Sequence, residues 1–438
     1  MTDKIKLWDV ELSRPLQDIA ELDGYRALQA LVRLHGVPIG TVTVPLSDGR
    51  CSAIALREAI SKEKGLAVVR HLLRDRLAQP LPRDGVEMED LIRTPPAVYH
   101  GPLPTVTVAV CTRDRTSTLE RCLDSVVRLD YPDLELLVVD NAPGNDATKQ
   151  LVRQRYPTVR YLCEPRPGLD WARNRAIAEA NGEIVAYTDD DAVADPDWVT
   201  ALARVFAEHP EVMAVTGLVV PLELETGAQI LFETYGGFGR GFARGWYRLD
   251  ECRSTRGLHI GSGRFGTGAN MAYRRSVFEQ IGSFDPALDV GTDTNGGGDL
   301  EMFFRVLQEG HSLVYEPGAI IRHQHRRSYD ELREQLTNHG IGLYSYFVRS
   351  ALAYPTMRLP IIRFGLWWFW WWGIRRLLIS FVRPARMPRD LILAEICGIF
   401  KGLFRYQKAR ERAAQIETTY GPVKREDNRE SPAMAKAN

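Results

Sequence analysis

Several features that would identify a specialised class of protein are missing from this sequence. Its 56 basic and 56 acidic residues cancel to a formal net charge of zero, so no overall positive charge favours a nucleic acid as the partner. The six cysteines include no C-x-x-C pair, which argues against a disulfide framework, a zinc ribbon and a redox pair. The longest uncharged apolar run, Phe364–Ile374, has 11 residues, whereas a membrane-spanning helix needs about 20.

The remaining composition is that of an ordinary folded protein. Apolar residues make up 45% and charged residues 26% of the chain, which excludes a mostly disordered or collagen-like chain. A length of 438 residues suggests two or three domains. The first residues contain no apolar stretch typical of a signal peptide, so we expect a cytoplasmic protein whose cysteines are mostly reduced core residues.

Residues 1–98 are expected to form a small N-terminal α+β module. Strand-favouring runs at Tyr25–Leu34 and Ile39–Val44 flank a turn, which predicts a hairpin. Helical periodicity follows in two segments, Ala53–Lys62 and Leu66–Leu77. No catalytic constellation stands out in this module, so its role stays open. The passage to the next domain is predicted to be a linker because of its prolines: Pro80, Pro82, Pro95 and Pro96.

Residues 104–330 alternate between strand-like and helix-like segments. Strands are predicted at Val106–Cys111, Leu134–Asp140, Val159–Leu162 and Glu183–Thr188. Helices are predicted between them, at Thr116–Leu129, Ala147–Arg155 and Gly168–Asn181. This alternation is typical of an α/β fold in which helices pack on a mostly parallel sheet.

The C-terminal part of the chain has a different composition. Residues 331–410 contain 13 Lys and Arg against 4 Asp and Glu, and five of the nine tryptophans lie within 367–372. We therefore expect a helical, basic, tryptophan-rich region. Residues 411–438 are polar and charged, which predicts a disordered tail.

Polar motifs follow three of the predicted strands. They are Cys111–Arg115, Val138–Asn141 and Tyr187–Ala192. In open α/β sheets, ligands bind beyond the carboxyl ends of the strands, so these motifs are expected at one edge. One acidic strand end commonly serves as a helix N-cap or a turn. Three at the same edge indicate a binding site.

Three consecutive aspartates, Asp189, Asp190 and Asp191, are the strongest signal. In an extended segment the first and third point to one side, and two carboxylates on one side suit Mg²⁺ or Mn²⁺. The alternative is an exposed acidic turn that caps the next helix. Further along, His323 or His325 is a candidate for an additional metal ligand, although a single histidine is usually structural.

Nucleotide-binding motifs of other classes are absent, since neither a P-loop nor a G-x-G-x-x-G follows the first strand. Instead, Arg173 and Arg175 lie on a predicted helix near the same edge, where a guanidinium group could contact a diphosphate or simply face solvent. The small-residue loop Gly266–Asn270 would let a sugar approach the backbone. Asp299 follows a glycine run at a helix start, where it is either a general base on a mobile loop or an N-cap.

A resemblance to the family 2 glycosyltransferases with the GT-A fold rests on five segments in order. They are VAVCTRDR (108–115), LVVDN (137–141), GLDWARN (168–174), TDDDA (188–192) and GGGDLE (296–301). The resemblance implies a nucleotide-sugar donor and a GT-A catalytic domain at residues 104–330. Asp140 is similar to the carboxylate that recognises the base. Asp189 and Asp191 are similar to the Asp-x-Asp pair on ribose and metal, and Asp299 to the base that activates the acceptor.

The expected site therefore has three parts. The donor and nucleotide side comprises Thr112, Arg113, Asp114, Asp140, Arg173, Asp189 and Asp190. The divalent metal, Mg²⁺ or Mn²⁺, is expected on Asp189 and Asp191 with His325, and the acceptor or sugar loop comprises Gly268, Asn270 and Glu301. One position departs from the family, which often has Glu-Asp where this chain has Gly298-Asp299. The role of a preceding carboxylate is therefore open.

The resulting interpretation is an inverting, metal-dependent glycosyltransferase of cell-envelope polysaccharide or glycolipid synthesis, with a UDP-sugar as the first expectation for the donor. A nucleotidyltransferase is one alternative, disfavoured because Cys111–Arg115 contains no glycine. A non-catalytic, membrane-bound sugar-binding protein is another, disfavoured by the intact Asp189, Asp191 and Asp299. The sequence identifies neither the sugar nor the acceptor.

The tryptophan-rich run also predicts membrane association. Leu366–Trp372 lies between Arg363 and the pair Arg375-Arg376. Tryptophan prefers the headgroup boundary, and each basic residue gains about 1 kcal/mol near an anionic leaflet. Together with the apolar and basic stretch Leu391–Phe404, this run suits helices lying in the interface. We expect a peripheral protein on the inner face of the cell membrane, acting on a lipid-linked or saccharide acceptor. The alternative is that the tryptophans pack against the catalytic domain or a sister subunit.

Overall fold

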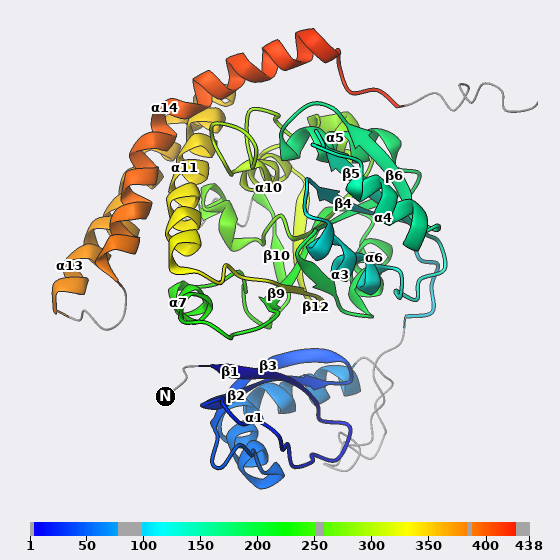
Figure 1. Cartoon of the computed structure of the whole chain (residues 1–438), viewed down its shortest axis with the longest axis vertical. Coiled ribbons are helices and arrows are strands. Elements are labelled where there is room, and N and C mark those ends of the chain that lie inside the picture. The colour runs from blue at the N-terminus through cyan, green and yellow to red at the C-terminus, as the bar shows by residue number, and fades with distance from the viewer. Residues whose placement is uncertain (1–3, 78–98, 250–257, 383–387, 426–438) are drawn as a thin grey trace, which may run out of the picture.

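The computed structural model describes residues 4–77, 99–249, 258–382 and 388–425 (Figure 1). Along the chain these residues form an N-terminal module, a central sheet domain and a set of C-terminal helices. Several sequence predictions fall outside the described residues. They concern the linker with Pro80, Pro82, Pro95 and Pro96, and residues 426–438 of the expected tail.

The N-terminal module is a three-stranded sheet with one helix packed on it. β1 (Ile5–Glu11) runs parallel to β2 (Ala27–Leu34), and β2 pairs antiparallel with β3 (Val37–Pro45). The predicted hairpin is confirmed, whereas β1 has no counterpart in the sequence prediction. Both predicted helical segments are confirmed, but the break between them is wrong, because one continuous helix, α1 (Ala53–Leu77), runs through both. A glycine inside a helix costs only about 1 kcal/mol relative to alanine, so Gly65 does not interrupt it.

The central domain is built on a mixed sheet, which has nine strands in the described residues. Their order is β10-β12-β9-β11-β7-β4-β5-β6, with β8 paired to β12. The strands are β4 (Val106–Thr112), β5 (Leu134–Asn141), β6 (Arg160–Glu164), β7 (Ile184–Asp189), β8 (Ala192–Ala194), β9 (Val212–Pro221), β10 (Gly245–Tyr247), β11 (Asn270–Arg274) and β12 (Ser312–His323). The α/β prediction is confirmed. However, only β7, β4, β5 and β6 form a continuous parallel half, because β11 runs antiparallel to both β7 and β9.

Helices cover both faces of this sheet. They are α3 (Thr116–Val126), α4 (Ala147–Arg155), α5 (Leu169–Glu179), α6 (Trp198–Glu208), α7 (Gly227–Tyr235), α9 (Val277–Ile281) and α10 (Gly298–Gln308), with the 3₁₀ turns η1 (Leu258–Ile260) and η2 (Ser262–Arg264). One core cluster joins the sheet to α3, α4 and α6, and a second joins its other face to α5, α9 and α10. Because β4, β5 and β7 are parallel, their carboxyl ends and the polar residues that follow them lie at one edge.

The C-terminal region is helical, as predicted. It comprises α11 (Tyr329–Ala353), η3 (Pro355–Met357), α12 (Arg358–Trp368), the π-helix η4 (Phe369–Ile374), α13 (Arg375–Val382) and α14 (Arg389–Tyr420). Figure 1 shows α14 running along α11. The disordered tail predicted from residue 411 is wrong for its first part, because α14 continues to Tyr420. Beyond the helix, the carbonyls of Gly421 and Pro422 accept hydrogen bonds from Arg166 of the central domain.

The N-terminal module is joined to the central domain by an ion-pair network. Arg33 on β2 contacts both Asp9 on β1 and Asp195, which follows β8. Arg322 on β12 contacts the same two carboxylates, with Nη1 lying 3.1 Å from Asp195 and Nη2 2.5 Å from Asp9. The contact therefore lies next to His323 and close in sequence to the three aspartates.

Candidate active site

The three aspartates lie where β7 ends and β8 begins. Asp189 is the last residue of β7, and β8 pairs antiparallel with β12 so that Ala192 lies opposite His323. This pairing brings Nε2 of His323 to 3.0 Å from Oδ1 of Asp191 and 3.6 Å from Oδ2 of Asp189. One ligand atom from each of these three residues lies within 4.8 Å of the others.

The middle aspartate, Asp190, is held by two residues at the end of β4 and just after it. Oγ1 of Thr112 donates to Oδ2 of Asp190 at 2.7 Å, and Arg115 donates to Oδ1 at 2.7 Å. The second amino group of Arg115 donates to Oδ2 of Asp191 at 2.7 Å. Thr112 and Arg115 therefore hold the acidic segment in place. The prediction of site residues omits Arg115, although it is part of the CTRDR motif.

The charges of this cluster shift each other's pKa values. Burial raises the pKa of Asp190 to about 7, against the opposing charge of Arg115. Burial would also raise the pKa of Asp191, but the charge and hydrogen bond of His323, followed by Arg115, hold it well below its ordinary value. Burial would lower the pKa of His323, yet Asp191 and Asp189 raise it to about 10. The cluster is thus a site where cations are strongly favoured.

Two carboxylates and one imidazole nitrogen are a suitable donor set for a divalent ion such as Mn²⁺. The third side chain is His323, not the predicted His325. Because β12 ends at His323, His325 lies beyond the strand pairing, and its Nε2 contacts Oε1 of Glu233 on α7 at 2.7 Å. The two histidines were indistinguishable by spacing, and only the pairing of β12 with β8 separates them.

A second carboxylate group lies at the end of β5. Asp140 is fully buried, and Tyr161 donates to its Oδ2 at 2.9 Å, while its Oδ1 accepts no hydrogen bond from the described residues. Burial raises the pKa of Asp140 to about 6. Asp114, after β4, accepts the Gly144 N–H at 2.9 Å and lies 3.8 Å from Nε of the half-exposed Arg113. These residues line the same sheet edge as the aspartates.

Asp299 lies in the first turn of α10 and faces the Gly266–Asn270 loop. The N–H of Gly268 donates to its Oδ2 at 2.8 Å, and the N–H of Leu300 to its Oδ1 at 2.8 Å. A Cβ at Gly268 would come within 2.7 Å of Nη2 of Arg173, so glycine is needed for this close packing. Burial and the negative charge of Asp289 raise the pKa of Asp299 to about 6, with Arg173 opposing.

Arg173 is surrounded by carboxylates of this region. Its Nη1 contacts Oδ1 of Asp170 at 2.8 Å and Oδ2 of Asp289 at 2.5 Å, and its charge also interacts with Asp299 and Asp189. Only 4% of Arg173 is exposed, so it is a buried link rather than the open diphosphate ligand that the sequence predicts. Sequence reasoning missed both partners, although Asp170 lies only three residues before Arg173 on α5. Asp289, by contrast, reaches this arginine only through folding.

The departure at Gly298 has a steric explanation. A Cβ at this position would overlap the carboxylate of Asp170. Asp170 is fully buried on α5 and therefore fills the space that a side chain on residue 298 would occupy. A carboxylate is thus present beside Asp299, but it comes from another element of the chain.

Three other residues are not brought to the site. The amide of Asn270 donates to the carbonyls of Leu218 and Ala319 and accepts from Trp198, so its side chain ties strands together. Glu301 is buried in ion pairs with Arg305 and Arg349. Arg175 faces Glu164 and the carbonyl of Lys424. Asn270 and Glu301 are therefore corrected from acceptor-site residues to structural ones.

Comparison with known proteins agrees with this architecture. Residues 107–282 match the sequence profile described as Glycosyl transferase family 2. A glucosyl-dolichyl phosphate glucuronosyltransferase of Haloferax volcanii is 26% identical over 248 residues, covering 52% of this chain and 72% of the relative. The human polypeptide N-acetylgalactosaminyltransferase 13 is 28% identical over 249 residues, covering 53% of this chain but only 43% of the relative.

Among solved structures, a Pyrobaculum calidifontis mannosyltransferase in complex with GDP-Man and Mn²⁺ is similar, with 20% identity and a TM-score of 0.48. The alignment covers 80% of this chain and 97% of that structure. The mixed sheet and the acidic group beyond its strands, together with the sequence relatives, support a sugar-transferring enzyme. The profile match over residues 107–282 is to glycosyltransferase family 2, and together with these relatives it supports a glycosyltransferase.

Proposed function

We propose that this protein transfers a sugar, with inversion, from a nucleotide-diphosphate sugar to an acceptor hydroxyl. The observation that carries the proposal is the cluster of Asp189, Asp191 and His323 at the end of β7, whose ligand atoms lie within 4.8 Å of one another. The named substrates of the sequence relatives support sugar transfer as the reaction class.

Asp189, Asp191 and His323 would hold a divalent ion, Mg²⁺ or Mn²⁺, and this ion would supply positive charge for the leaving diphosphate. Thr112 and Arg115 hold the acidic segment in place through Asp190 and Asp191. The nucleoside would occupy the edge formed by Arg113, Asp114 and Asp140, where the free Oδ1 of Asp140 can accept a hydrogen bond from the base. A UDP-sugar is the donor that we propose.

Asp299 would remove the proton from the acceptor hydroxyl as that oxygen attacks the anomeric carbon. The N–H groups of Gly268 and Leu300 each occupy one of its carboxylate oxygens, which fixes the direction of the remaining lone pairs. A pKa of about 6 keeps the carboxylate ionised at neutral pH while making it a stronger base than an exposed aspartate. A single displacement by this base inverts the anomeric configuration.

The proposal is tested by substituting the acidic cluster. We expect Asp191→Asn to abolish transfer and donor hydrolysis, since one ligand of the ion is lost. Asparagine is preferable to alanine because Arg115 and His323 both contact this buried side chain, and the melting temperature checks that the fold is kept. Full activity of the variant, or of the parent in EDTA, would contradict the assignment.

A thermal-shift screen against UDP-, GDP- and dTDP-sugars with Mn²⁺ identifies the donor, because a ligand that binds only the native state stabilises it. A donor-hydrolysis assay with added Mn²⁺ separates the two alternatives. A nucleotidyltransferase would release diphosphate from a nucleoside triphosphate, and a non-catalytic sugar-binding protein would bind a donor without turnover. Transfer with a retained anomeric configuration would rule out the single displacement.

We further propose that the acceptor is presented at a membrane, in cell-envelope glycolipid or polysaccharide synthesis, with the protein peripheral on the cytoplasmic face. In the described residues, every helix is too short or too polar to cross a bilayer. Trp367, Trp370 and Trp371 are nevertheless 47%, 55% and 45% exposed. Arg375 stacks on Trp371, with 4.2 Å from its guanidinium carbon to the ring centroid. Exposed tryptophan beside arginine is typical of surfaces at the headgroup boundary.

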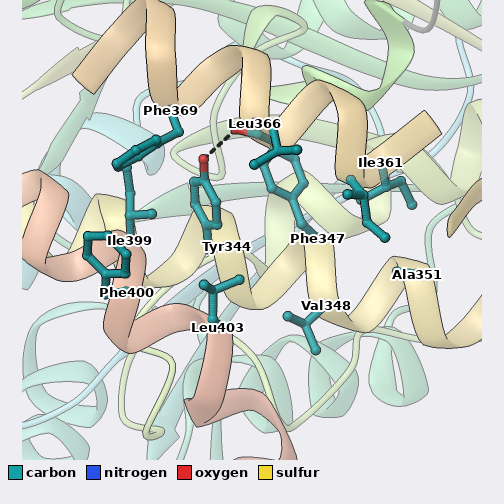
Figure 2. Close-up of a pocket in the computed structure, with 12 residues that line it drawn as sticks. Tyr344, Phe347, Val348, Ala351, Ile361, Leu366, Phe369, Ile399, Phe400 and Leu403 are labelled. Carbon is teal, nitrogen blue, oxygen red and sulfur yellow. Dashed lines mark hydrogen bonds between the residues drawn. The ribbon is translucent and has the colours of Figure 1, made fainter. Parts of the chain in front are cut away.

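A groove beside these tryptophans suits the hydrocarbon part of a lipid-linked acceptor. It has a volume of about 290 Å³ and lies between α11, α12 with η4, and α14 (Figure 2). Its lining side chains are apolar, apart from Tyr344, whose hydroxyl already donates to the Gly365 carbonyl at 2.7 Å. The walls belong to the same core cluster as Leu300 and Phe304 of α10, the helix that begins beside Asp299. A lipid held here would therefore lie on the helix that carries the base.

Liposome sedimentation tests the membrane proposal. The double variant Trp370→Ala, Trp371→Ala should lose binding to anionic vesicles at low salt while keeping hydrolysis of the donor. The matched control is Trp246→Ala, which removes a partly exposed tryptophan from β10 in the central domain. If the parent protein does not sediment with anionic vesicles, the proposed membrane association is wrong. The proposed transfer reaction is tested separately, by the activity assays above.

A further inference from the structure

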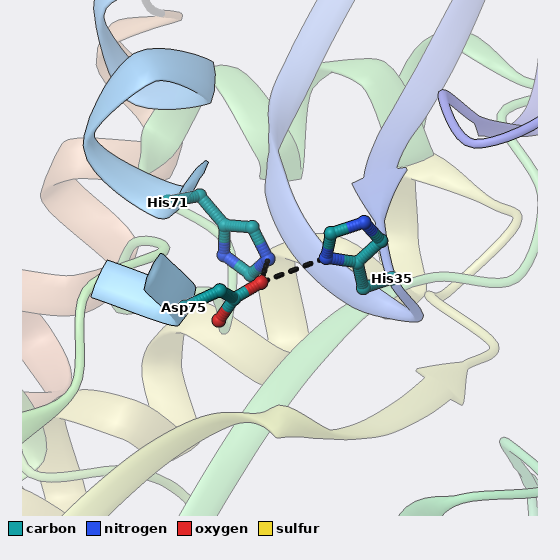
Figure 3. Close-up of side chains that lie close together, drawn as sticks. All are labelled: His35, His71 and Asp75. Atoms are coloured by element: carbon teal, nitrogen blue, oxygen red, sulfur yellow. Dashed lines mark hydrogen bonds and ion pairs between the residues drawn. The ribbon is translucent and has the colours of Figure 1, made fainter. Parts of the chain in front are cut away.

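A cluster of two imidazoles and one carboxylate lies in the N-terminal module, outside the catalytic domain. His35 comes from the β2–β3 turn, and His71 and Asp75 come from α1 (Figure 3). Nδ1 of His35 lies 2.7 Å, and Nε2 of His71 3.1 Å, from the same oxygen of Asp75, Oδ2. We propose that these three side chains form a second metal site, which takes a zinc-like divalent ion and fastens the β2–β3 turn to α1.

The ligand nitrogen of His71 is buried without a hydrogen bond. The residue is only 7% exposed, and within the described chain its Nε2 has no hydrogen-bond partner of acceptable geometry, although Asp75 is close. A buried polar atom without a hydrogen bond is destabilising. A metal ion between the two imidazoles and the carboxylate would use this free lone pair.

The backbone delivers the three groups to one point from two directions. His71 and Asp75 are four residues apart on a helix, so their side chains share one face. His35 has a φ of +55°, a left-handed conformation that is uncommon for a residue with a side chain. The N–H groups of His35 and Gly36 donate to the carboxylate of Glu11 at 3.1 and 2.9 Å, which holds the turn in this conformation. The turn is therefore built to direct His35 toward α1.

The donor set favours zinc over the ion of the catalytic site. Imidazole suits Zn²⁺, whereas Mg²⁺ and Ca²⁺ prefer oxygen, and three protein ligands leave a fourth tetrahedral position for water. Bonds of about 2.0–2.1 Å require the three ligand atoms to move slightly apart, which side-chain rotation allows. Glu11 adds a nearby negative charge that acts on His71.

The site would support the contact between the module and the central domain. A Cβ at Gly36, next to His35, would lie 3.8 Å from Oδ2 of Asp197, which precedes α6. Arg33, two residues before His35, forms the ion pair with Asp195. A metal that fixes this turn therefore fixes the segment that touches the central domain. The role is structural, and it does not depend on the proposed transfer reaction.

Zinc stoichiometry and affinity of the full chain test the proposal, by equilibrium dialysis after chelator treatment. The parent should bind one more Zn²⁺ than either His71→Gln or His35→Gln, because each substitution removes one ligand. Loss of an outer partner alone weakens metal binding about 10–100-fold, so loss of a ligand should exceed that. The exposed His100 provides the matched control, and His100→Gln should bind like the parent. Asp191→Asn should keep the extra ion, since the two clusters share no residue.

Two readouts distinguish a metal site from an ion-pair network. Zinc should raise the melting temperature of the parent by more than that of His71→Gln, which keeps only the cluster of Asp189, Asp191 and His323. In EDTA the two proteins should melt closely together. Cobalt should give the parent a visible absorption typical of four-coordinate Co²⁺ that both histidine variants lack. If His71→Gln and His35→Gln bind zinc with the stoichiometry and affinity of the parent, the cluster is only a carboxylate shared by two imidazoles.

Discussion

At the residue scale, the environment of Asp299 combines burial with two backbone donors. The N–H groups of Gly268 and Leu300 would stabilise an ionised carboxylate, and burial opposes ionisation more strongly, so the pKa rises to about 6. The neighbouring carboxylate, Asp170, fills the space beside Gly298 and forms an ion pair with Arg173. Asp299 is therefore the carboxylate of this group that can act as a base.

Replacement of Asp299 by asparagine keeps the size of the side chain and one hydrogen-bond acceptor but removes its capacity to take a proton. We expect kcat to fall by roughly 10²–10⁴, the usual contribution of a general base, with donor affinity preserved. Asp293→Asn, in the loop before α10, is the control and should keep kcat near the parent value. An Asp299→Asn enzyme with near-parental turnover would reduce this residue to a helix-capping role.

The pH profile gives a second prediction for the same site. Because the base must be ionised, kcat should rise with pH through about 6, the pKa to which burial and Asp289 raise Asp299. Asp289→Asn removes the like charge and releases Arg173 from one partner, and both effects lower the pKa of Asp299. The rise in kcat should therefore move to lower pH in this variant. A profile that moves to higher pH, or does not move, contradicts the role of Asp289.

At the element scale, the packing of α14 on α11 depends on close backbone contact. A Cβ at Gly398 would overlap the carbonyl of Thr337, and one at Gly402 would come within 2.5 Å of the carbonyl of Ile341. The helices that form the apolar groove can thus lie side by side only because both positions lack a side chain. The tryptophan-bearing elements α12 and η4 pack on this pair.

We therefore expect Gly398→Ala to destabilise the C-terminal region by about 1–3 kcal/mol, the usual cost of overpacking. The matched control is Gly65→Ala in α1, where the space around the position is open. Alanine there should stabilise by up to about 1 kcal/mol because it is the better helix former. Thermal unfolding followed by circular dichroism measures both. A Gly398→Ala protein as stable as the parent would mean that the two helices have room to separate.

At the scale of the whole molecule, one buried carboxylate links two domains. Asp195, close in sequence to Asp191, is shared by Arg33 of the N-terminal module and Arg322 of β12. Burial alone would raise the pKa of Asp195, but the hydrogen bond and charge of Arg33, followed by those of Arg322, lower it. The module is therefore coupled electrostatically to the strand that ends at His323.

Arg33→Leu should cost about 1.5–3 kcal/mol, the typical value of a hydrogen bond to a charged group, since Arg322 still partners Asp195. The lowered pKa means that the parent's extra stability is present above the unfolded value of about 4 and is lost as pH falls through the folded value. The difference between parent and Arg33→Leu should therefore shrink below pH 4. The control is Arg14→Leu, which changes an exposed arginine and should melt like the parent. If Arg33→Leu also melts like the parent, the ion pair between Arg33 and Asp195 does not stabilise the molecule.

Much of the catalytic domain is readable from the sequence because its signals are local. Apolar runs such as Leu134–Asp140 end in turn-forming polar residues, and the structure has β5 at nearly the same bounds. The extension of α14 to Tyr420 was not readable, because a polar helix exposed to solvent has the same composition as a disordered segment. The continuous helix α1 was predicted as two helices for a related reason. Gly65 resembles a helix boundary when it is considered without the helix-forming residues on either side of it.

By itself, the sequence determined the α/β alternation, the placement of acidic residues at the strand ends, and the identity of Asp189, Asp191 and Asp299 as the candidate chemical groups. The tertiary structure alone decided which partners they have. It places His323, not His325, beside Asp191, and it brings Arg115 to the acidic cluster. It also shows that the side chains of Asn270 and Glu301 form structural contacts away from the site. The physical reason is that these contacts join segments far apart in the chain. A histidine or an arginine acquires its role from the charge placed opposite it, and strand pairing, not local pattern, sets that placement.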